Sequence, residues 1–196
     1  MAPFLRVASC DFSPLVTLPM PEELFDIVDD QDRVIGQMAR SEVHRRKLFH
    51  RAVSIFVFDS RGRLLLQQRS ATKDESPLCY TSSASGHVTA GEDYDETAPR
   101  EMQEELGLTS PVERLAKFSA GPETANEFTV LYRTVTDTPP QFDPGEIAGG
   151  AFYELSEIAD WLVRAPEQFS PPFRIAFEWY RQFGVRRPEP PLFHST

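Results

Sequence analysis

Runs of hydrophobic residues, and stretches in which hydrophobic and polar residues alternate, predict a series of β-strands along the chain. The nearly continuous apolar run at residues 52–58 predicts a buried central strand, and residues 63–69 predict its partner after a short turn. Alternation at residues 24–28 and 33–38, on either side of an acidic turn, predicts an N-terminal hairpin. Three later runs have the same strand-like character and lie at residues 114–119, 127–136 and 151–154.

Other segments combine capping residues with the hydrophobic spacing of helices. Ser41 is expected to cap a short helix that ends at residue 47, and Ser156 to cap a helix that ends at residue 164. Residues 171–183 predict a further helix whose aromatic side chains we interpret as packing residues rather than a platform for bases. These aromatic residues recur at helical spacing and are Phe173, Phe177 and Tyr180. A loop rich in proline and glycine is expected at residues 138–145.

The two ends of the chain differ from the segment between them. Residues 1–22 contain four prolines among scattered apolar residues and predict an extended arm, and residues 186–196 predict a polar, proline-rich tail. The remaining segment, residues 23–185, is expected to form one domain, because 196 residues are enough for a single core. Acidic and proline-rich residues follow the apolar first ten residues at once, so we expect no signal peptide.

Composition and charge narrow the choice of partners. Hydrophobic residues make up 40% and charged residues 26%, which is typical of a soluble globular protein. Twenty basic and 30 acidic residues give a formal net charge of −10, which argues against a nucleic-acid polymer or an anionic membrane as the main partner. There is no run of 18 apolar residues for a membrane span. Cys10 and Cys79 are too few for a disulfide framework, so we expect a reducing compartment and a cytoplasmic location.

A helix with a strongly acidic face is predicted near the middle of the chain. Glu101, Glu104 and Glu105 are three and four residues apart, so their side chains share one face of a helix. Like charges at this spacing repel each other, and carboxylate oxygens are ligands for Mg²⁺. The helix should bury an apolar stripe and end at Gly107; the residues of that stripe are Ala98, Met102 and Leu106. The sequence therefore predicts a helix with one core face and one metal-binding face.

Pro99 lies inside this predicted helix. A helix that begins near Asp93 would need the backbone N–H that proline lacks. Either the helix is kinked at Pro99, or its regular part begins late, with Thr97 as N-cap and the proline in the first turn. The glutamates follow the proline in both cases, so their shared face is kept.

The spacing of these residues resembles the Nudix box. Gly86 is followed after five residues by Glu92, and after seven more by residues 100–108, which read Arg-Glu-Met-Gln-Glu-Glu-Leu-Gly-Leu. Every fixed position of the box is matched. The resemblance implies a Nudix-type α/β/α sandwich with a mixed β-sheet, to which this chain adds the N-terminal hairpin. A surface helix with a solvated acidic face would explain neither Gly86 nor the position of Glu92.

Two further strings, at residues 50–54 and 64–70, resemble the Nudix branch that contains type I isopentenyl-diphosphate isomerase and its hydrolase relatives. This resemblance covers roughly residues 23 to 182. The isomerases use a catalytic cysteine before a Gly/Ser-His pair, and Ser85 stands at that place here. A serine hydroxyl does not replace a thiol in proton transfer, because the thiol pKa is about 8.5 and is easily lowered. The serine at this position is a departure from the isomerase pattern, and it therefore favours a hydrolase over an isomerase.

The isomerases also bind a second metal through histidines. His50 and His87 match two of those positions, whereas His44 lies one residue out of register with the third. Neutral imidazoles with a carboxylate can hold Zn²⁺ or Mn²⁺. The other interpretation is that His50 packs at the start of a strand and that His87 lines the substrate loop. We favour that second interpretation because of the offset of His44, and the sequence leaves the question open.

The resemblance implies roles for several other residues. Arg100 is expected to orient Glu104 across one helix turn, and Glu146 to act as an extra metal ligand or a general base. Arg69 and Lys73 are the nearest cations before the box and could bind a diphosphate. Glu127 is expected at a strand start that faces the active site. Glu146 could instead be a loop carboxylate in water, and Arg69 and Lys73 could be ordinary surface residues.

The expected function is Mg²⁺-dependent hydrolysis of a nucleoside diphosphate derivative or a related organic diphosphate, with Mn²⁺ as an alternative ion. One to three metal ions would be held by the glutamates, with Gly86 beside them. Isomerisation of a short isoprenoid diphosphate is the second hypothesis, and a catalytically idle Nudix binding module is the third. The expected partner is a small diphosphate, and the sequence leaves both the substrate and the choice between monomer and homodimer open.

Overall fold

The computed structural model describes residues 22–184. All but the last residue of the predicted arm at 1–22, and the whole predicted tail at 186–196, lie outside the described residues. The boundaries of the domain expected at residues 23–185 stay a prediction.

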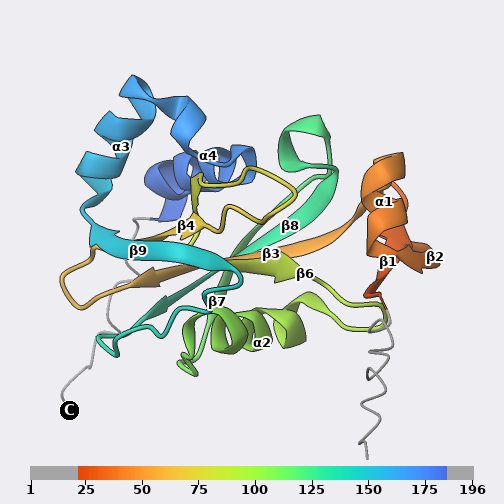
Figure 1. Ribbon diagram of the computed structural model, residues 1–196, viewed down its shortest axis with the longest axis horizontal. Coiled ribbons are helices and arrows are strands. Elements are labelled where there is room, and N and C mark those ends of the chain that lie inside the picture. Colours follow the sequence, from red (N-terminus) through yellow and green to blue (C-terminus); the bar gives the residue numbers. More distant parts are fainter. Residues whose placement is uncertain (1–21, 185–196) are drawn as a thin grey trace, which may run out of the picture.

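A mixed sheet of seven strands forms the middle of the molecule (Figure 1). Its order is β5-β4-β3-β8-β7, with β6 also paired to β3 and β9 to β4. The pair β3–β8 is parallel and the other pairs are antiparallel. The strand bounds are β3 His50–Phe58, β4 Leu64–Arg69, β5 Tyr80–Thr81, β6 Ala84–His87, β7 Glu113–Phe118, β8 Glu127–Val135 and β9 Ile147–Tyr153. The apolar run at 52–58 is indeed the central strand.

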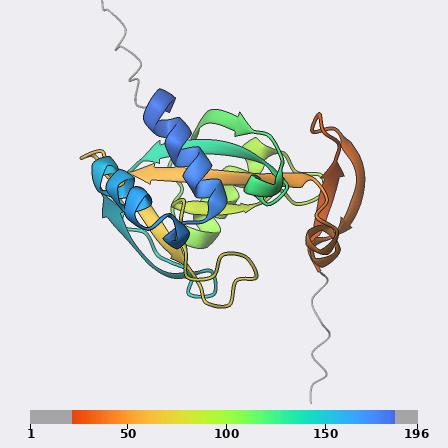
Figure 2. The ribbon, with the colours of Figure 1, turned by 90° about the horizontal axis from the view of Figure 1, so that it is seen from above.

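Helices cover both faces of this sheet, which confirms the expected α/β/α sandwich. Helix α2 lies on one face, and α3 and α4 lie on the other (Figures 1 and 2). Their bounds are α2 Tyr94–Leu106, α3 Leu155–Arg164 and α4 Pro171–Trp179. Short helical turns lie at Pro122–Thr124, Pro166–Gln168 and Tyr180–Gly184. Within the described residues, no helix is both long and apolar enough to cross a membrane.

Each face of the sheet has its own hydrophobic core, because successive side chains of a strand point to opposite faces. On the α2 side, Met102 and Leu106 are fully buried against alternate residues of β3 such as Ile55. On the α4 side, Phe56 packs against Phe173, with ring centroids 5.8 Å apart. The aromatic residues of the C-terminal helical segment, Phe173, Phe177 and Tyr180, are packing residues as predicted.

Helix α2 begins early and continues through Pro99, so the late start at Thr97, one of the two alternatives, is wrong. The Asp93 side chain accepts hydrogen bonds from the first turn, and Glu96 bonds back to the Asp93 N–H. This reciprocal cap satisfies the N–H groups that a helix start leaves without partners. The Thr97 hydroxyl instead donates to the Asp93 carbonyl at 2.8 Å, inside the helix. The helix ends at Gly107, whose φ of 64° is left-handed as expected.

Three other local predictions need correction. The first helix, α1, spans Arg40–Arg46 with Ala39 as N-cap, so Ser41 lies inside it and does not cap it. Helix α3 has Glu154 as N-cap rather than Ser156, because the Glu157 carboxylate accepts from the Glu154 N–H at 2.9 Å. The last strand begins at residue 147 rather than 151, because its glycines pair with β4.

The N-terminal hairpin and α1 stand at one end of the sheet (Figure 1). The hairpin consists of β1, Leu24–Val28, and β2, Val34–Ala39. Its turn is fixed to the domain by Asp32, which accepts from Arg51 Nε at 2.6 Å and Tyr94 Oη at 2.9 Å and forms an ion pair with Lys117. Burial alone would raise the pKa of Asp32, but these donors hold it below its usual value. This anchor fixes where α1 lies relative to the sheet.

Candidate active site

A pocket of about 430 Å³ is lined by residues of α1, α2, the loop after β4 and the neighbouring strands of the sheet. Its lining brings together ten of the eleven residues that the sequence singles out, which are Arg69, Lys73, Gly86, His87, Arg100, Glu101, Glu104, Glu105, Glu127 and Glu146. The eleventh, His50, contacts Glu127 at the side of the pocket. Residues up to 77 positions apart in the chain therefore face one space.

The three glutamates of α2 share one face of the helix and differ in exposure. The Glu101 side chain is 12% exposed, Glu104 is 59% exposed, and Glu105 is buried. Burial raises the pKa of Glu101 to about 7, and burial with the neighbouring Glu101 raises the pKa of Glu105 to about 7. Two carboxylates that are costly to ionise together are suited to bind a divalent cation, which removes that cost.

Glu105 is held in place by uncharged donors from the sheet. Its Oε2 accepts from the Ser85 backbone N–H at 3.1 Å and from Gln67 Nε2 at 3.0 Å. Gln67 is a functional residue that the sequence reasoning missed. A polar residue at the end of the buried run at 64–66 was the available signal.

Arg100 connects four groups of the box. Its Nη1 donates to Glu101 at 2.8 Å and to Glu104 at 3.0 Å, which is the predicted contact across one helix turn. Its Nη2 donates to Glu92 at 2.9 Å and to the His87 carbonyl at 3.3 Å. Burial disfavours this charge, but the hydrogen bond from Arg100 to Glu92 and the nearby carboxylates raise the guanidinium pKa. Arg100 thus fixes both the helix glutamates and the loop before them.

Basic side chains also line the pocket. Lys73 forms an ion pair with Glu146, and burial together with the nearby Arg69 lowers the Lys73 pKa. Arg69 also lines the pocket and donates through Nε to the Glu75 carbonyl at 3.0 Å. A third cation, Arg40, comes from the start of α1, and its Nε is buried without a hydrogen-bond partner. The sequence reasoning missed Arg40, because nothing local shows that α1 lies over the pocket.

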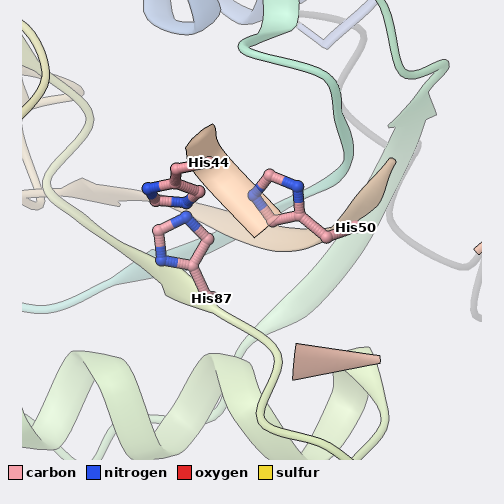
Figure 3. A group of neighbouring side chains, drawn as sticks. All are labelled: His44, His50 and His87. Atoms are coloured by element: carbon pink, nitrogen blue, oxygen red, sulfur yellow. The ribbon is translucent and has the colours of Figure 1, made fainter. Parts of the chain in front are cut away.

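Three histidines converge beside the pocket (Figure 3). One ligand atom from each of His44, His50 and His87 lies within 4.8 Å of the others. Despite its one-residue offset in the sequence, His44 joins the other two, because α1 brings the centre of its ring to 5.0 Å from that of His87. Phe25 of β1 covers the group, with its ring stacked 5.6 Å from His50 and 4.6 Å from His87.

The hydrogen bonds of this histidine cluster suit a cation. The His50 Nδ1–H donates to the Leu48 carbonyl at 2.9 Å, and His50 Nε2 faces Glu127, whose Oε1 is 3.6 Å away. Glu127 also lies 3.1 Å from His87 Nε2. Burial alone would raise the Glu127 pKa, but these imidazoles lower it to about 2. Burial and the two neighbouring rings lower the His44 pKa to about 4, which leaves that ring neutral and able to bind a metal.

With fold and site described, the class of protein follows. The chain belongs to the Nudix family: the NUDIX domain model matches residues 48–173.

The relatives divide between two names. An isopentenyl-diphosphate Delta-isomerase of Serratia proteamaculans is 36% identical over 76% of this chain and 86% of its own length. An uncharacterised Nudix hydrolase of Nostoc is 35% identical over 71% of this chain and 85% of its own length. The resemblance to the branch that holds the isomerases is thus confirmed, and both kinds of relative extend over most of the chain.

Solved structures agree with the fold. The crystal structure of a Deinococcus radiodurans protein superposes with a TM-score of 0.70 at 30% identity and covers 82% of this chain and 99% of that protein. The NUDIX domain of Shewanella oneidensis NrtR, solved with ADP ribose, has a TM-score of 0.55 at 16% identity over 74% of this chain and 98% of its own. At that identity the second likeness shows the fold alone.

Proposed function

We propose that this protein is a metal-dependent hydrolase of a nucleoside diphosphate derivative or a related organic diphosphate. The observation that carries the proposal is the meeting, in one pocket, of the α2 glutamates with the cations Arg40, Arg69 and Lys73. Carboxylates suit divalent metal ions, and basic side chains suit phosphate oxygens. A diphosphate with bound Mg²⁺ is complementary to both sets of side chains at once. The net charge of −10 makes such a local group of cations necessary for an anionic substrate.

Glu101, Glu104 and Glu105 are the residues that would hold the metal, with Gly86 leaving room beside Glu101. Their fit to a divalent cation rests on the raised pKa values of the two buried carboxyls, which a cation would lower. When bound, Mg²⁺ or Mn²⁺ neutralises diphosphate oxygens and makes a water molecule more acidic. Glu104, the most exposed of the three, would also take part in the catalysis.

The other pocket residues bind and orient the substrate. Arg100 holds Glu101 and Glu104 in one arrangement through its two hydrogen bonds. Lys73 and Arg69, with Arg40, would hold the diphosphate oxygens by charge-assisted hydrogen bonds. Glu146 would then exchange its ion pair with Lys73 for a role as general base or extra ligand.

Isomerisation of a short isoprenoid diphosphate is the second candidate, and the histidine cluster is the observation that favours it. His44, His50 and His87 with Glu127 form a donor set for Zn²⁺ or Mn²⁺, and a 36% identical relative is named an isopentenyl-diphosphate isomerase. Ser85 argues against this reaction, because it stands in the pocket where the resembling isomerases have a reactive thiol. In a hydrolase, His50, His87 and Glu127 would instead bind the substrate, with or without a second metal.

Purified protein with Mg²⁺ should be incubated with a panel of nucleoside diphosphate derivatives and with isopentenyl diphosphate. The account predicts release of phosphate or a nucleotide from at least one nucleoside derivative, and no allylic isomer in the product NMR spectrum. Metal-dependent appearance of the allylic isomer at a catalytic rate, without hydrolysis of any derivative, would favour the second candidate.

A further inference from the structure

The face of the sheet that α4 covers becomes polar where it forms the pocket floor. Along β3, Phe56 packs under α4, whereas Ser54, two residues earlier and on the same face, lines the pocket. Along β8, Leu131 belongs to the same core as Phe56, and Thr129 lines the pocket instead. The change from apolar to hydroxyl side chains therefore follows the boundary between the core and the pocket.

The hydroxyls of this floor are buried, and one of them has no partner. Ser54 and Ser82 are hydrogen-bonded to each other at 2.5 Å, whereas Thr129 Oγ1 has no hydrogen-bond partner although the residue is only 5% exposed. Burying a hydroxyl without a partner costs free energy, and valine would fill the same place on a strand without that cost. If Thr129 served only for packing, its unpartnered hydroxyl would lower the stability of the protein without any gain.

The other unpartnered buried polar atoms also gather around this pocket. Among the described residues they are Arg40 Nε, His44 Nε2, His50 Nε2 and Arg100 Nε, with Thr129 Oγ1 as the fifth. All belong to residues that line the pocket or its histidine cluster. Unsatisfied groups concentrated at one place point to a ligand that supplies the missing partners. Carboxylates and histidines in the same pocket can take up a metal, and Arg40, Arg69 and Lys73 can take up a diphosphate, so the hydroxyls of the floor remain for the rest of the substrate.

We infer that Thr129, on the hydroxyl floor with Ser54 and Ser82, binds the organic part of the substrate by hydrogen bonding. A sugar or base offers O–H, N–H and C=O groups to this floor, whereas a prenyl chain would leave the Thr129 hydroxyl without a partner. A site that hydrogen-bonds a substrate group discriminates strongly against analogues that lack it. The floor thus selects nucleoside diphosphates over alkyl or prenyl diphosphates. This inference rests on the proposed function, which places a diphosphate in the pocket.

The test compares Thr129→Val with wild type by calorimetric binding in Mg²⁺. The two ligands are non-hydrolysable, methylene-bridged analogues of ADP and of isopentenyl diphosphate. The variant should bind the ADP analogue about tenfold or more weakly and the prenyl analogue at least as tightly as before. Thr129→Ser, which keeps the hydroxyl, should restore affinity for the ADP analogue. Thr134→Val, a buried threonine on the same strand outside the pocket, should change neither affinity.

The inference would be overturned if Thr129→Val lost affinity equally for both analogues, or lost none for the ADP analogue. It would also be overturned if wild type bound neither analogue. A lower melting temperature of the ligand-free Thr129→Val variant would show that the hydroxyl is structural. Hydrolysis of ADP derivatives by wild type is measured separately. If the predicted binding selectivity is found but wild type hydrolyses no ADP derivative, the proposed function fails and the inference stands. If wild type hydrolyses ADP derivatives but Thr129→Val binds both analogues as wild type does, the inference fails and the proposed function stands.

Discussion

Gly86 and Glu101 are in such close contact that no side chain fits between them. A Cβ placed on Gly86 would lie 2.0 Å from the Glu101 carboxyl carbon and 2.2 and 2.3 Å from its oxygens. The backbone at Gly86 does not have a positive φ, so it is the space rather than the conformation that requires glycine here. The glycine of the box therefore positions a carboxylate of the helix.

This contact predicts the effect of Gly86→Ala. The new methyl group would displace the flexible Glu101 side chain rather than the fold, so the melting temperature should change little. Mg²⁺ affinity and hydrolysis should fall roughly 10- to 100-fold, as when the supports of a metal ligand are lost. Gly36→Ala is the control, because a Cβ there would meet nothing within 4 Å. Full Mg²⁺ affinity in Gly86→Ala would show that Glu101 is not held for a metal.

The two buried carboxyls predict an unusual pH dependence of stability without metal. Their pKa values are about 7 in the folded protein against an ordinary value of 4.5, so the folded state binds more protons between these two pH values. Their contribution is fully present below pH 4.5 and is lost as the pH rises through about 7. His44, with its lowered pKa, acts in the opposite direction, so the comparison must be with Glu101→Gln/Glu105→Gln.

Urea unfolding in chelator across this pH range measures the difference. The free energy of unfolding of wild type, relative to the double variant, should fall by on the order of 3 kcal/mol or more as the pH rises, which is what one carboxyl with this shift contributes. A flat difference would mean that the two carboxyls titrate normally in the folded protein.

Metal should reverse this loss of stability. Because the carboxylates must be ionised to bind, Mg²⁺ should raise the melting temperature of wild type, and more strongly above pH 7 than below it. At a concentration about 100-fold above Kd, linkage gives roughly 3 kcal/mol, which is several degrees for a domain of this size. The triple variant with glutamine at positions 101, 104 and 105 should show no rise. Without metal it should be at least as stable as wild type; a much lower melting temperature would make the glutamates structural.

Ser85 is expected to be dispensable for hydrolysis. It contributes its backbone N–H to Glu105, at 3.1 Å, and Ser85→Ala keeps that bond. The variant should retain most hydrolytic activity. If the Ser85 hydroxyl took part in proton transfer, its removal would make the variant inactive instead. Neither wild type nor the variant should convert isopentenyl diphosphate to its allylic isomer, and NMR of the products checks both expectations.

Much of the fold and part of the site could be predicted because their signals are local. The apolar run of β3 and the spacing of Glu101, Glu104 and Glu105 depend only on the period of a strand or helix. The place of the helix start was harder, because Asp93 and Thr97 are both good caps. In the structure Asp93 is the N-cap, because it forms reciprocal hydrogen bonds with Glu96, and the helix continues through Pro99.

The remaining site residues depend on how distant segments pair. The parallel register of β3 and β8 places Glu127 opposite His50, and the Asp32 anchor places α1, with Arg40 and His44, over the pocket. The helical and strand periods of the sequence contain no information about such contacts between distant segments. Thr129 was equally hidden, because a threonine in a strand is ordinary until its hydroxyl is found without a partner.

Hydrolysis by Glu105→Gln tests the central claim most directly. Glutamine can keep the hydrogen bonds from Gln67 and Ser85 through its carbonyl oxygen, so the variant should fold, while one negative charge of the metal-binding face is lost. Activity should be measured on the best nucleoside diphosphate derivative in Mg²⁺, beside wild type and Glu178→Gln, an exposed glutamate on α4. The account predicts that Glu105→Gln loses at least about 100-fold in kcat/KM and that chelator abolishes wild-type activity, with Glu178→Gln unaffected. Undiminished hydrolysis by Glu105→Gln, or full wild-type activity in excess chelator, would contradict it.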